Sequence, residues 1–347
     1  MKSALLTGLS SIEIQERKKP EIRNPDDVLI RMESVGICGS DIHYYREGGI
    51  GDAKISYPYS IGHEGAGTVE ETGPGVRTLR PGDRIAIDPA MPCFSCKQCR
   101  AGRPHMCENL RFLGCPDQAE GCLSEYIIMP ETSCFPIPAS VTFDQAVIAE
   151  PLTIGLYSVK RSGITGADSA AVLGAGPIGL SVLLTLQYKY GTSVYVSEKI
   201  PERMEAACRA GAVWAGNPDE ENIPGSLLKQ AGGEPDIVFE CCGKQEAVND
   251  AVEILRPGGT LVIVGIPSVD TITFDPHLIR RKEISILNIR RQNGCVQETL
   301  DLIAEKHIDA DVMITHRFPL SEVADAFSLV ADYRDGVIKA LVEFGNK

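Results

Sequence analysis

Residues 170–179 have the sequence AAVLGAGPIG, in which an apolar run is followed by three spaced glycines. Gly174 permits a tight turn, Gly176 lets the backbone approach a pyrophosphate, and Gly179 lets a helix pack closely on a strand. The stretch therefore predicts a buried strand, a turn and a helix whose N-terminus binds the pyrophosphate of a dinucleotide. Because glycines also mark ordinary strand-to-helix turns, this prediction needs a second feature.

An acidic residue supplies that second feature. Glu198 lies 19 residues after Gly179, at the end of the next apolar run, where a carboxylate can accept hydrogen bonds from both ribose hydroxyls. A carboxylate there repels a 2′-phosphate, so the pattern favours NAD over NADP. Lys199 and Arg203 follow closely and can weaken that repulsion. Without the glycines, Glu198 would be interpreted as a solvated residue at a strand end.

The segment around this stretch alternates between apolar runs and helix-length segments. Such alternation is typical of a parallel sheet with helices on both faces, and it predicts an α/β domain. The candidate buried strands are Ala171–Leu173, Ser193–Val196, Ile237–Phe239, Leu261–Val264 and Ile284–Leu287. Candidate helices between them include Pro201–Ala210 and Gln245–Leu255.

The regions on either side differ in composition and in their pattern of apolar residues. Residues 1–151 are rich in glycine and proline, and their short apolar or alternating runs predict a mostly β domain. These runs are Val28–Val35, Gly67–Glu71, Arg84–Ile87 and Tyr126–Met129. The C-terminal region predicts helices over Cys295–Ala304 and Ser321–Val330, then an alternating strand over Val337–Phe344.

Length and charge limit the possible functions. The chain has 347 residues, enough for two domains with separate cores. Its net charge of −13 argues against binding nucleic acid or a membrane surface through a basic patch. Residues 169–190 carry one charge, but their glycines and proline favour a strand, a turn and a buried helix over a membrane span. We therefore expect a cytoplasmic protein with a small-molecule partner.

Twelve cysteines without an export signal favour metal ligands or free thiols over disulfides. Four of them, Cys93, Cys96, Cys99 and Cys107, follow a C-x2-C-x2-C-x7-C pattern in one polar loop. Four thiolates so close together can complete a tetrahedral zinc site with no open position, so the predicted site is structural. Apart from position 38, the other cysteines lack such spacing, and we expect core or loop residues there.

A second set of potential ligands is more widely spaced. Cys38 lies in the sequence GICGSD at residues 36–41, and His63 and Glu64 lie in GHEG at residues 62–65. A thiolate, an imidazole and a carboxylate suit a catalytic zinc that keeps one position for water or substrate. The long spacing leaves open the alternative that Cys38 and His63 are ordinary core residues.

Taken in order along the chain, these features resemble the zinc-dependent medium-chain dehydrogenase family. The resemblance rests on residues 36–44, 62–67, 81–84 and 174–179 and on the four-cysteine loop. It implies a GroES-like β domain over residues 1–153, completed by residues 291–347, and a Rossmann domain with a doubly wound parallel sheet over residues 154–290. It also implies an active site in the cleft between the domains and a homotetramer or homodimer.

Within that family, residues 36–44, 48–52, 150–152 and 316–320 are similar to the polyol branch, of which sorbitol dehydrogenase is typical. The resemblance implies that Cys38, His63 and Glu64 bind the catalytic zinc. It implies that Glu150 is either a direct ligand or holds the zinc-bound water. The absence of a cysteine as third ligand points to the polyol and threonine branches.

The same resemblance implies substrate-binding residues. Tyr44 and Arg290 match positions that the polyol enzymes use near the substrate. Arg291 replaces the tyrosine usual in animal sorbitol dehydrogenases, and its guanidinium can bind a hydroxyl, a carboxylate or a phosphate. A sugar acid, an inositol or a sugar phosphate is therefore an open alternative, as is an Arg291 that faces solvent or the cofactor phosphates.

The resemblance also implies a route for the proton released in alcohol oxidation. The route runs through Ser40, the nicotinamide ribose and His43, or through zinc-bound water steered by Glu150. Ser40 as a helix cap and His43 as a surface residue are the alternatives. Further cofactor contacts are expected from Thr153, Pro177, Ile178, Arg203, Val264, Gly265, Ile266 and Ile289.

Together these inferences predict a zinc- and NAD-dependent oxidoreductase that converts a secondary hydroxyl of a polyol or sugar-derived alcohol to a ketone. L-Threonine 3-dehydrogenase and 2,3-butanediol dehydrogenase share the ligand pattern and remain open. The alternative from another class is a zinc-stabilised nucleotide-binding sensor without turnover. It is disfavoured because a sensor does not need Ser40 and His43 beside the three ligands.

Overall fold

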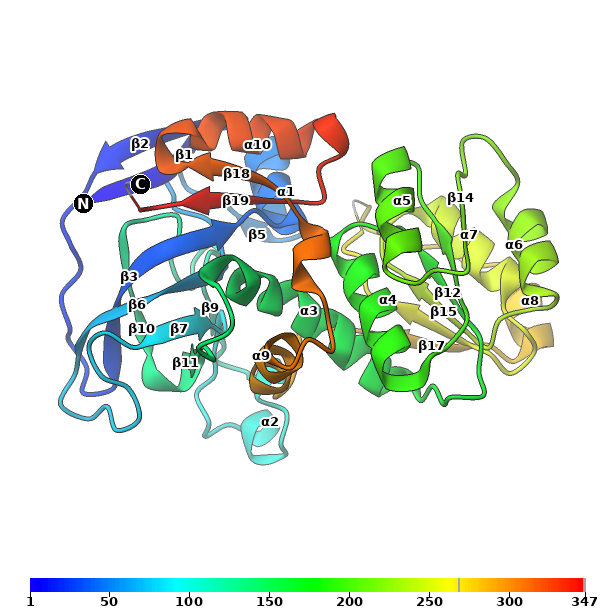
Figure 1. Ribbon diagram of the computed structural model, residues 1–347, viewed down its shortest axis with the longest axis horizontal. Helices are drawn as coiled ribbons and strands as arrows, with labels where there is room; N and C mark the ends of the chain where they lie inside the picture. Colours follow the sequence, from blue (N-terminus) through cyan, green and yellow to red (C-terminus); the bar gives the residue numbers. More distant parts are fainter. Residues whose placement is uncertain (268, 346–347) are drawn as a thin grey trace. The chain divides into compact units, whose positions relative to one another are not determined.

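The computed structural model describes residues 1–267 and 269–345, which form two compact units. The first unit contains Met1–Glu150, Val296–Lys306 and the described chain from Ile314 onward, and the second contains Pro151–Cys295 and His307–Met313. Each unit has its own sheet (Figure 1). The C-terminal segment therefore returns to the first unit. Residues 151–153, 291–295 and 307–313 were also predicted there, but they group with the second unit.

A seven-stranded sheet forms the centre of the first unit. Its strands follow the order β11-β7-β6-β3-β19-β18, and β10 also pairs with β3. β19 is buried from Lys339 to Val342, so side chains on both of its faces are covered and the expected alternating pattern is wrong. Ala340 and Val342 belong to the core, and α10 contacts this strand. The strands are β3 (Asp27–Gly36), β6 (Glu64–Thr72), β7 (Arg84–Ile87), β10 (Tyr126–Pro130), β11 (Cys134–Pro136), β18 (Ile314–Pro319) and β19 (Lys339–Glu343).

Three small strand pairs and several helices complete this unit. β1 pairs antiparallel with β2, β4 with β5, and β8 with β9. α3 crosses the boundary between the units at Glu150. Their bounds are β1 (Lys2–Gly8), β2 (Ser11–Glu16), β4 (Gly49–Ile50), β5 (Ala53–Lys54), β8 (Ala90–Met91), β9 (Arg111–Phe112), α1 (Gly39–Glu47), α2 (Lys97–Arg100), α3 (Phe143–Ser162), α9 (Val296–Ala304) and α10 (Val323–Ala331).

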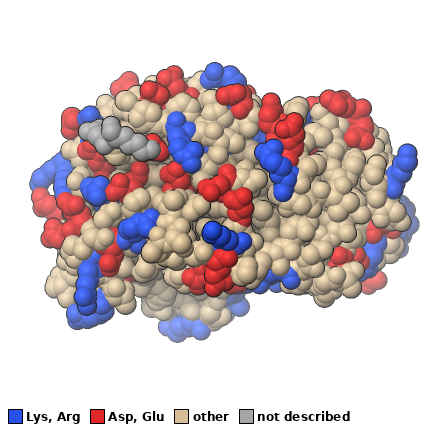
Figure 2. Space-filling view, in the orientation of Figure 1, with Lys and Arg blue, Asp and Glu red and all other residues tan. Residues whose placement is uncertain are grey.

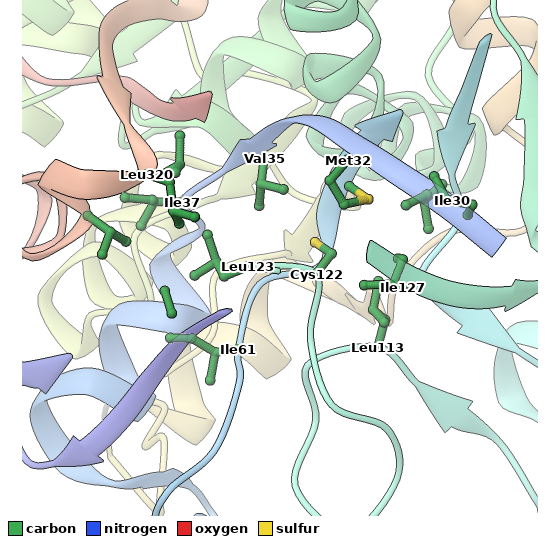
Figure 3. Close-up of a cluster of buried hydrophobic side chains, with 14 of the residues drawn as sticks. Ile30, Met32, Val35, Ile37, Ile61, Leu113, Cys122, Leu123, Ile127 and Leu320 are labelled. Carbon is green, nitrogen blue, oxygen red and sulfur yellow. The ribbon is translucent and has the colours of Figure 1, made fainter. Parts of the chain in front are cut away.

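Buried apolar side chains hold the first unit together. Figure 3 shows Ile37 and Ile61 in one such cluster, and both are at most 2% exposed. Ile37 directly precedes Cys38, and Ile61 lies two residues before His63. Burial of these two isoleucines therefore anchors both chain segments that carry the predicted ligands.

The second unit contains a six-stranded sheet in which every pair is parallel, with the order β14-β13-β12-β15-β16-β17. This order reverses between β12 and β15, as in Rossmann folds, and confirms the predicted fold class. The strands are β12 (Ala170–Leu173), β13 (Val194–Ser197), β14 (Trp214–Gly216), β15 (Ile237–Glu240), β16 (Thr260–Ile263) and β17 (Ser285–Asn288). The helices are α4 (Pro177–Tyr190), α5 (Pro201–Arg209), α6 (Ile223–Ala231), α7 (Gln245–Ile254) and α8 (Pro276–Lys282).

One predicted strand of this sheet differs in its surroundings. β17 was expected to be buried, but Ser285, Ile286 and Asn288 are exposed because β17 is the edge strand and pairs only with β16. The other four predicted strands of this sheet are confirmed. The glycine-rich stretch forms a strand, a turn and α4, as predicted.

Acidic and basic side chains are interspersed on the face of the molecule that Figure 2 presents. Within the described residues, no helix combines the length and the apolar character needed to span a membrane.

Candidate active site and metal centres

Cys38 lies where β3 ends and α1 begins. It is the N-cap of α1, and its backbone N–H donates a 2.9 Å hydrogen bond to Oδ2 of Asp41 in the first helical turn. An acidic residue in this turn also interacts favourably with the helix dipole. The local sequence therefore fixes the backbone of Cys38, and the helix-cap alternative for Ser40 is wrong.

Glu64 is the first residue of β6, and His63 directly precedes it. Glu64 pairs in register with Gly36 of β3 and is completely buried. A Cβ atom at position 36 would lie 2.2 Å from Oε2 of Glu64, so only glycine leaves room for this carboxylate.

The structure brings the three predicted ligands together. One ligand atom from each of Cys38, His63 and Glu64 lies within 4.8 Å of the other two. A thiolate, an imidazole and a carboxylate are donors that zinc accepts in sites with three protein ligands and one open position. The residues present therefore fit a catalytic zinc.

Asp41 supports this group and was not singled out as a site residue from the sequence. It is completely buried, its Oδ1 accepts a 3.2 Å hydrogen bond from the N–H of Gly62, and the same atom lies 3.5 Å from Nδ1 of His63. Burial lowers the pKa of His63, but the charges of Asp41 and Cys38 more than offset it, so the net shift is upward. The sequence signal that could have identified Asp41 was its position three residues after Cys38, in the first turn of α1.

Lys339 is the second residue that the sequence analysis missed. Its Nζ donates 2.7 Å hydrogen bonds to both Oε1 and Oε2 of Glu64 and a 3.1 Å bond to the carbonyl oxygen of Ile37. The available signal was a single cation inside the apolar run Val337–Val342.

Glu150 lies in α3 and is electrostatically coupled to the same group. Burial raises the pKa of Glu150 to about 7; the charges of His63 and Lys339 lower it, and those of Glu64 and Asp88 raise it. Glu150 is not part of the cluster of mutually close ligand atoms found among the described residues.

The predicted relay and substrate residues of α1 have protein partners. Nδ1 of His43 lies 3.3 Å from Oε1 of Glu47, one helical turn away, and the His43 side chain is 23% exposed. Tyr44 is buried, and its hydroxyl contacts Sγ of Cys115 at 3.8 Å. Burial is the largest cause of the raised pKa of Tyr44.

The four-cysteine loop gathers its thiols tightly. Sγ of Cys107 lies 3.4 Å from Sγ of Cys93 and 3.9 Å from Sγ of Cys96, which lies 3.5 Å from Sγ of Cys99. Zn–S bonds of about 2.3 Å in a tetrahedron require sulfur–sulfur distances of about 3.8 Å. Backbone N–H groups of Cys93, Cys99 and Asn109 point at these sulfurs, which stabilises thiolates. The loop therefore fits a structural zinc.

The other predicted residues of the second unit gather at the carboxyl edge of its sheet. Gly174 has a φ of +96°, and a Cβ at Gly179 would lie 1.8 Å from the carbonyl oxygen of Gly174, so the turn requires both glycines. Gly176 is the N-cap of α4, and Pro177 and Ile178 begin the helix. Val264 and Gly265 both donate to the carbonyl oxygen of Glu240 after β16, Ile266 follows them, and Ile289 donates to the carbonyl oxygen of Ile263.

Glu198 is fixed by the backbone. Its Oε2 accepts a 2.7 Å hydrogen bond from the N–H of Ala175, and its Oε1 accepts bonds from Lys199 and Ile200. Nη1 of Arg203 lies 3.4 Å from where a Cβ at Gly176 would be. A carboxylate and a guanidinium thus flank the glycine turn.

Three further predicted residues belong to the second unit. Thr153 is buried in α3. Arg290 follows β17 and is exposed, and Arg291 is half-buried with a positive φ of 55°.

Comparison with known proteins identifies related chains for both units. Residues 24–139 match the model of the alcohol dehydrogenase GroES-like domain, and residues 177–305 match that of the zinc-binding dehydrogenases. Sorbitol dehydrogenase of Gallus gallus is 35% identical over 320 residues, which cover 91% of this chain and 89% of the relative.

Solved structures give the same result. An alcohol dehydrogenase of E. coli CFT073, complexed with NADH, and a putative zinc-binding dehydrogenase of Sinorhizobium meliloti 1021, bound to NADP, each have a TM-score of 0.90, 32% identity and 99% coverage of both chains. Galactitol-1-phosphate dehydrogenase of Escherichia coli has a TM-score of 0.89 at 27% identity, covering 99% of this chain and all of its own.

Proposed function

We propose that this chain, which belongs to the zinc-binding alcohol dehydrogenase family, oxidises a secondary hydroxyl of a polyol or sugar-derived alcohol to a ketone with NAD. The proposal rests on the group formed by Cys38, His63 and Glu64, in which the third donor is a carboxylate. A relative that is 35% identical is named sorbitol dehydrogenase, and sorbitol is such a polyol.

The residues that would hold the two cofactors follow from the site. Cys38, His63 and Glu64 would bind zinc, whose Lewis acidity lowers the pKa of a substrate hydroxyl, and NAD accepts the hydride. The glycine turn and Glu198 would bind the dinucleotide, with Arg203 against its pyrophosphate. The fixed carboxylate of Glu198 supports the choice of NAD.

The chain's own residues would remove the proton. Glu150, whose pKa burial raises to about 7, can accept a proton near neutral pH and pass it to water. Ser40 and His43 would form the second route, in which Nε2 of His43 would accept the proton while Nδ1 contacts Glu47.

An anionic substrate is the second candidate. Arg291 places a guanidinium where animal sorbitol dehydrogenases have tyrosine, and a guanidinium binds carboxylate or phosphate with two parallel hydrogen bonds. The similarity to galactitol-1-phosphate dehydrogenase supports a sugar phosphate. Arg290 would contact a hydroxyl in either case.

The test is the initial rate of NAD reduction on sorbitol, xylitol, inositols, aldonic acids, sugar phosphates, L-threonine and butanediol, with and without a zinc chelator. Chelator-sensitive oxidation of neutral polyols supports the first proposal, and activity restricted to anions supports the second. Activity on threonine or butanediol alone, or no activity at all, contradicts both.

A further inference from the structure

A buried lysine of the C-terminal strand lies at the candidate catalytic centre. Lys339 is 1% exposed, and its ammonium group has three acceptors: both carboxylate oxygens of Glu64 and the carbonyl oxygen of Ile37. An ammonium group has three donors, so all three are used. Lys339 therefore uses two of its donors to hold Glu64 and the third to hold the carbonyl oxygen of Ile37, next to Cys38.

The strand register places the backbones of the two partners on neighbouring parts of one sheet. Glu64 lies opposite Gly36 of β3, and Leu341 of β19 lies opposite the same glycine on the other side. Lys339 itself pairs with Ile314 of β18. Two residues 275 positions apart in the sequence are thus brought together by neighbouring strands of one sheet.

The same carboxylate oxygens are the ones that Glu64 would offer to a metal. One of them lies within 4.8 Å of a ligand atom of Cys38 and of His63, so a metal held by these two residues would compete for an oxygen that Lys339 already binds. Each oxygen has two lone pairs and can be shared, but the ammonium and a divalent cation repel each other at this distance.

We propose that Lys339 is a positioning residue that competes with the catalytic metal for Glu64 and so keeps this carboxylate a weak, exchangeable ligand. The inference rests on the proposed function, because it takes Cys38 and His63 as metal ligands. It predicts that loss of the lysine charge has opposite effects on the stability of the metal-free protein and on the affinity for the metal. Removal of the lysine charge leaves Glu64 buried without a counter-charge, which destabilises the metal-free chain and strengthens metal binding.

The experiment compares wild type with Lys339→Met. The purified full-length protein is stripped of metal, and dissociation constants for Zn²⁺ and Co²⁺ are measured by competition with a chelator, together with the visible spectrum of the Co²⁺ form. We expect the dissociation constant of the Cys38 site to fall about tenfold or more, the size of effects typical of residues that contact metal ligands. The affinity of the four-cysteine site is expected to stay unchanged.

A Glu64→Gln background tests whether the effect acts through Glu64. In Glu64→Gln/Lys339→Met, both members of the ion pair are neutral, and the gain in affinity is expected to disappear. Should Lys339→Met fail to fold, Lys339→Gln keeps a hydrogen-bonding amide NH₂ group without the charge and is expected to show the same tighter binding. Lys282, which donates to Glu234 and to two carbonyl oxygens in the second unit, gives the matched control Lys282→Met, with no expected change.

The outcomes separate this inference from the proposed function. Tighter binding that depends on Glu64, with an altered Co²⁺ spectrum, supports competition. Unchanged or weaker binding overturns it, because a merely structural lysine, or one that only orients Glu64 for the metal, would give that result. A wild-type chain that binds no metal at Cys38 overturns the proposed function itself.

Discussion

The two candidate metal centres of the first unit are built in opposite ways. The four-cysteine loop takes its ligands from residues 93–107 and surrounds them with backbone N–H donors. The Cys38 site takes its ligands from two distant segments and surrounds them with Asp41, Glu150 and Lys339. A site closed by equivalent thiolates stabilises a fold, whereas a site with mixed donors and charged neighbours can exchange ligands and protons.

The largest expected effect separates the two centres by activity. Cys38→Ser removes the thiolate ligand and is expected to lower kcat by about 1,000-fold or more, since the Lewis acid is lost. NAD affinity, measured by fluorescence titration, and the melting temperature are expected to change little. Zinc analysis should show loss of one metal per chain, and an enzyme that retains activity would refute the assignment.

The converse substitution is expected to act on stability. Cys99→Ser opens the four-thiolate site, and because binding of a structural metal contributes directly to folding, we expect the first unit to lose about 3 kcal/mol or more. Thermal unfolding with parallel zinc analysis checks this. Cys208→Ser, at an exposed cysteine in the second unit, is the matched control. Unchanged melting and zinc content would contradict a metal in this loop.

Substitution of Asp41, which contacts the ligand His63, should have an intermediate effect on activity. Asp41→Asn keeps the size of the side chain but removes the charge beside His63, and we expect kcat/KM to fall 10- to 100-fold. Weaker zinc binding at the Cys38 site should accompany the loss. Asp83→Asn, which changes an aspartate that accepts from Arg80 on a distant turn, serves as control. Equal losses in both variants would show a general effect on folding.

The same contrast explains what the sequence could predict. The cysteine loop and the glycine turn are local, so the spacing of the cysteines, and that of the glycines together with Glu198, indicated both sites. The alternation of apolar runs with helix-length segments indicated the parallel sheet. Lys339 could not be assigned to Glu64, because only the register of β3, β6 and β19 joins them. The exposure of β17 was also missed, since apolar content does not tell an edge strand from a central one.

The smallest expected effect concerns the second unit, where the described residues include no group of metal-ligating side chains. Its stability should resist chelators and respond to acid. Burial raises the pKa of Asp236, but hydrogen bonds from Ser169 and Arg256 more than offset it, so the folded pKa lies below the unfolded value of 3.8. The stabilisation is therefore complete above that value and is lost as the pH falls through the folded pKa.

Asp236→Asn tests this relation. At neutral pH we expect the variant to lose about 1 to 2 kcal/mol, the contribution of hydrogen bonds to a charged acceptor. Below pH 4 the difference from wild type should shrink, because the wild-type carboxylate also loses its charge. Urea unfolding at pH 7 and pH 3, in the presence of a chelator, measures both values. A difference in unfolding free energy that stays constant with pH would mean that the charge of Asp236 does not stabilise the junction of β12 and β15. The shape of its side chain alone would then hold Ser169 there.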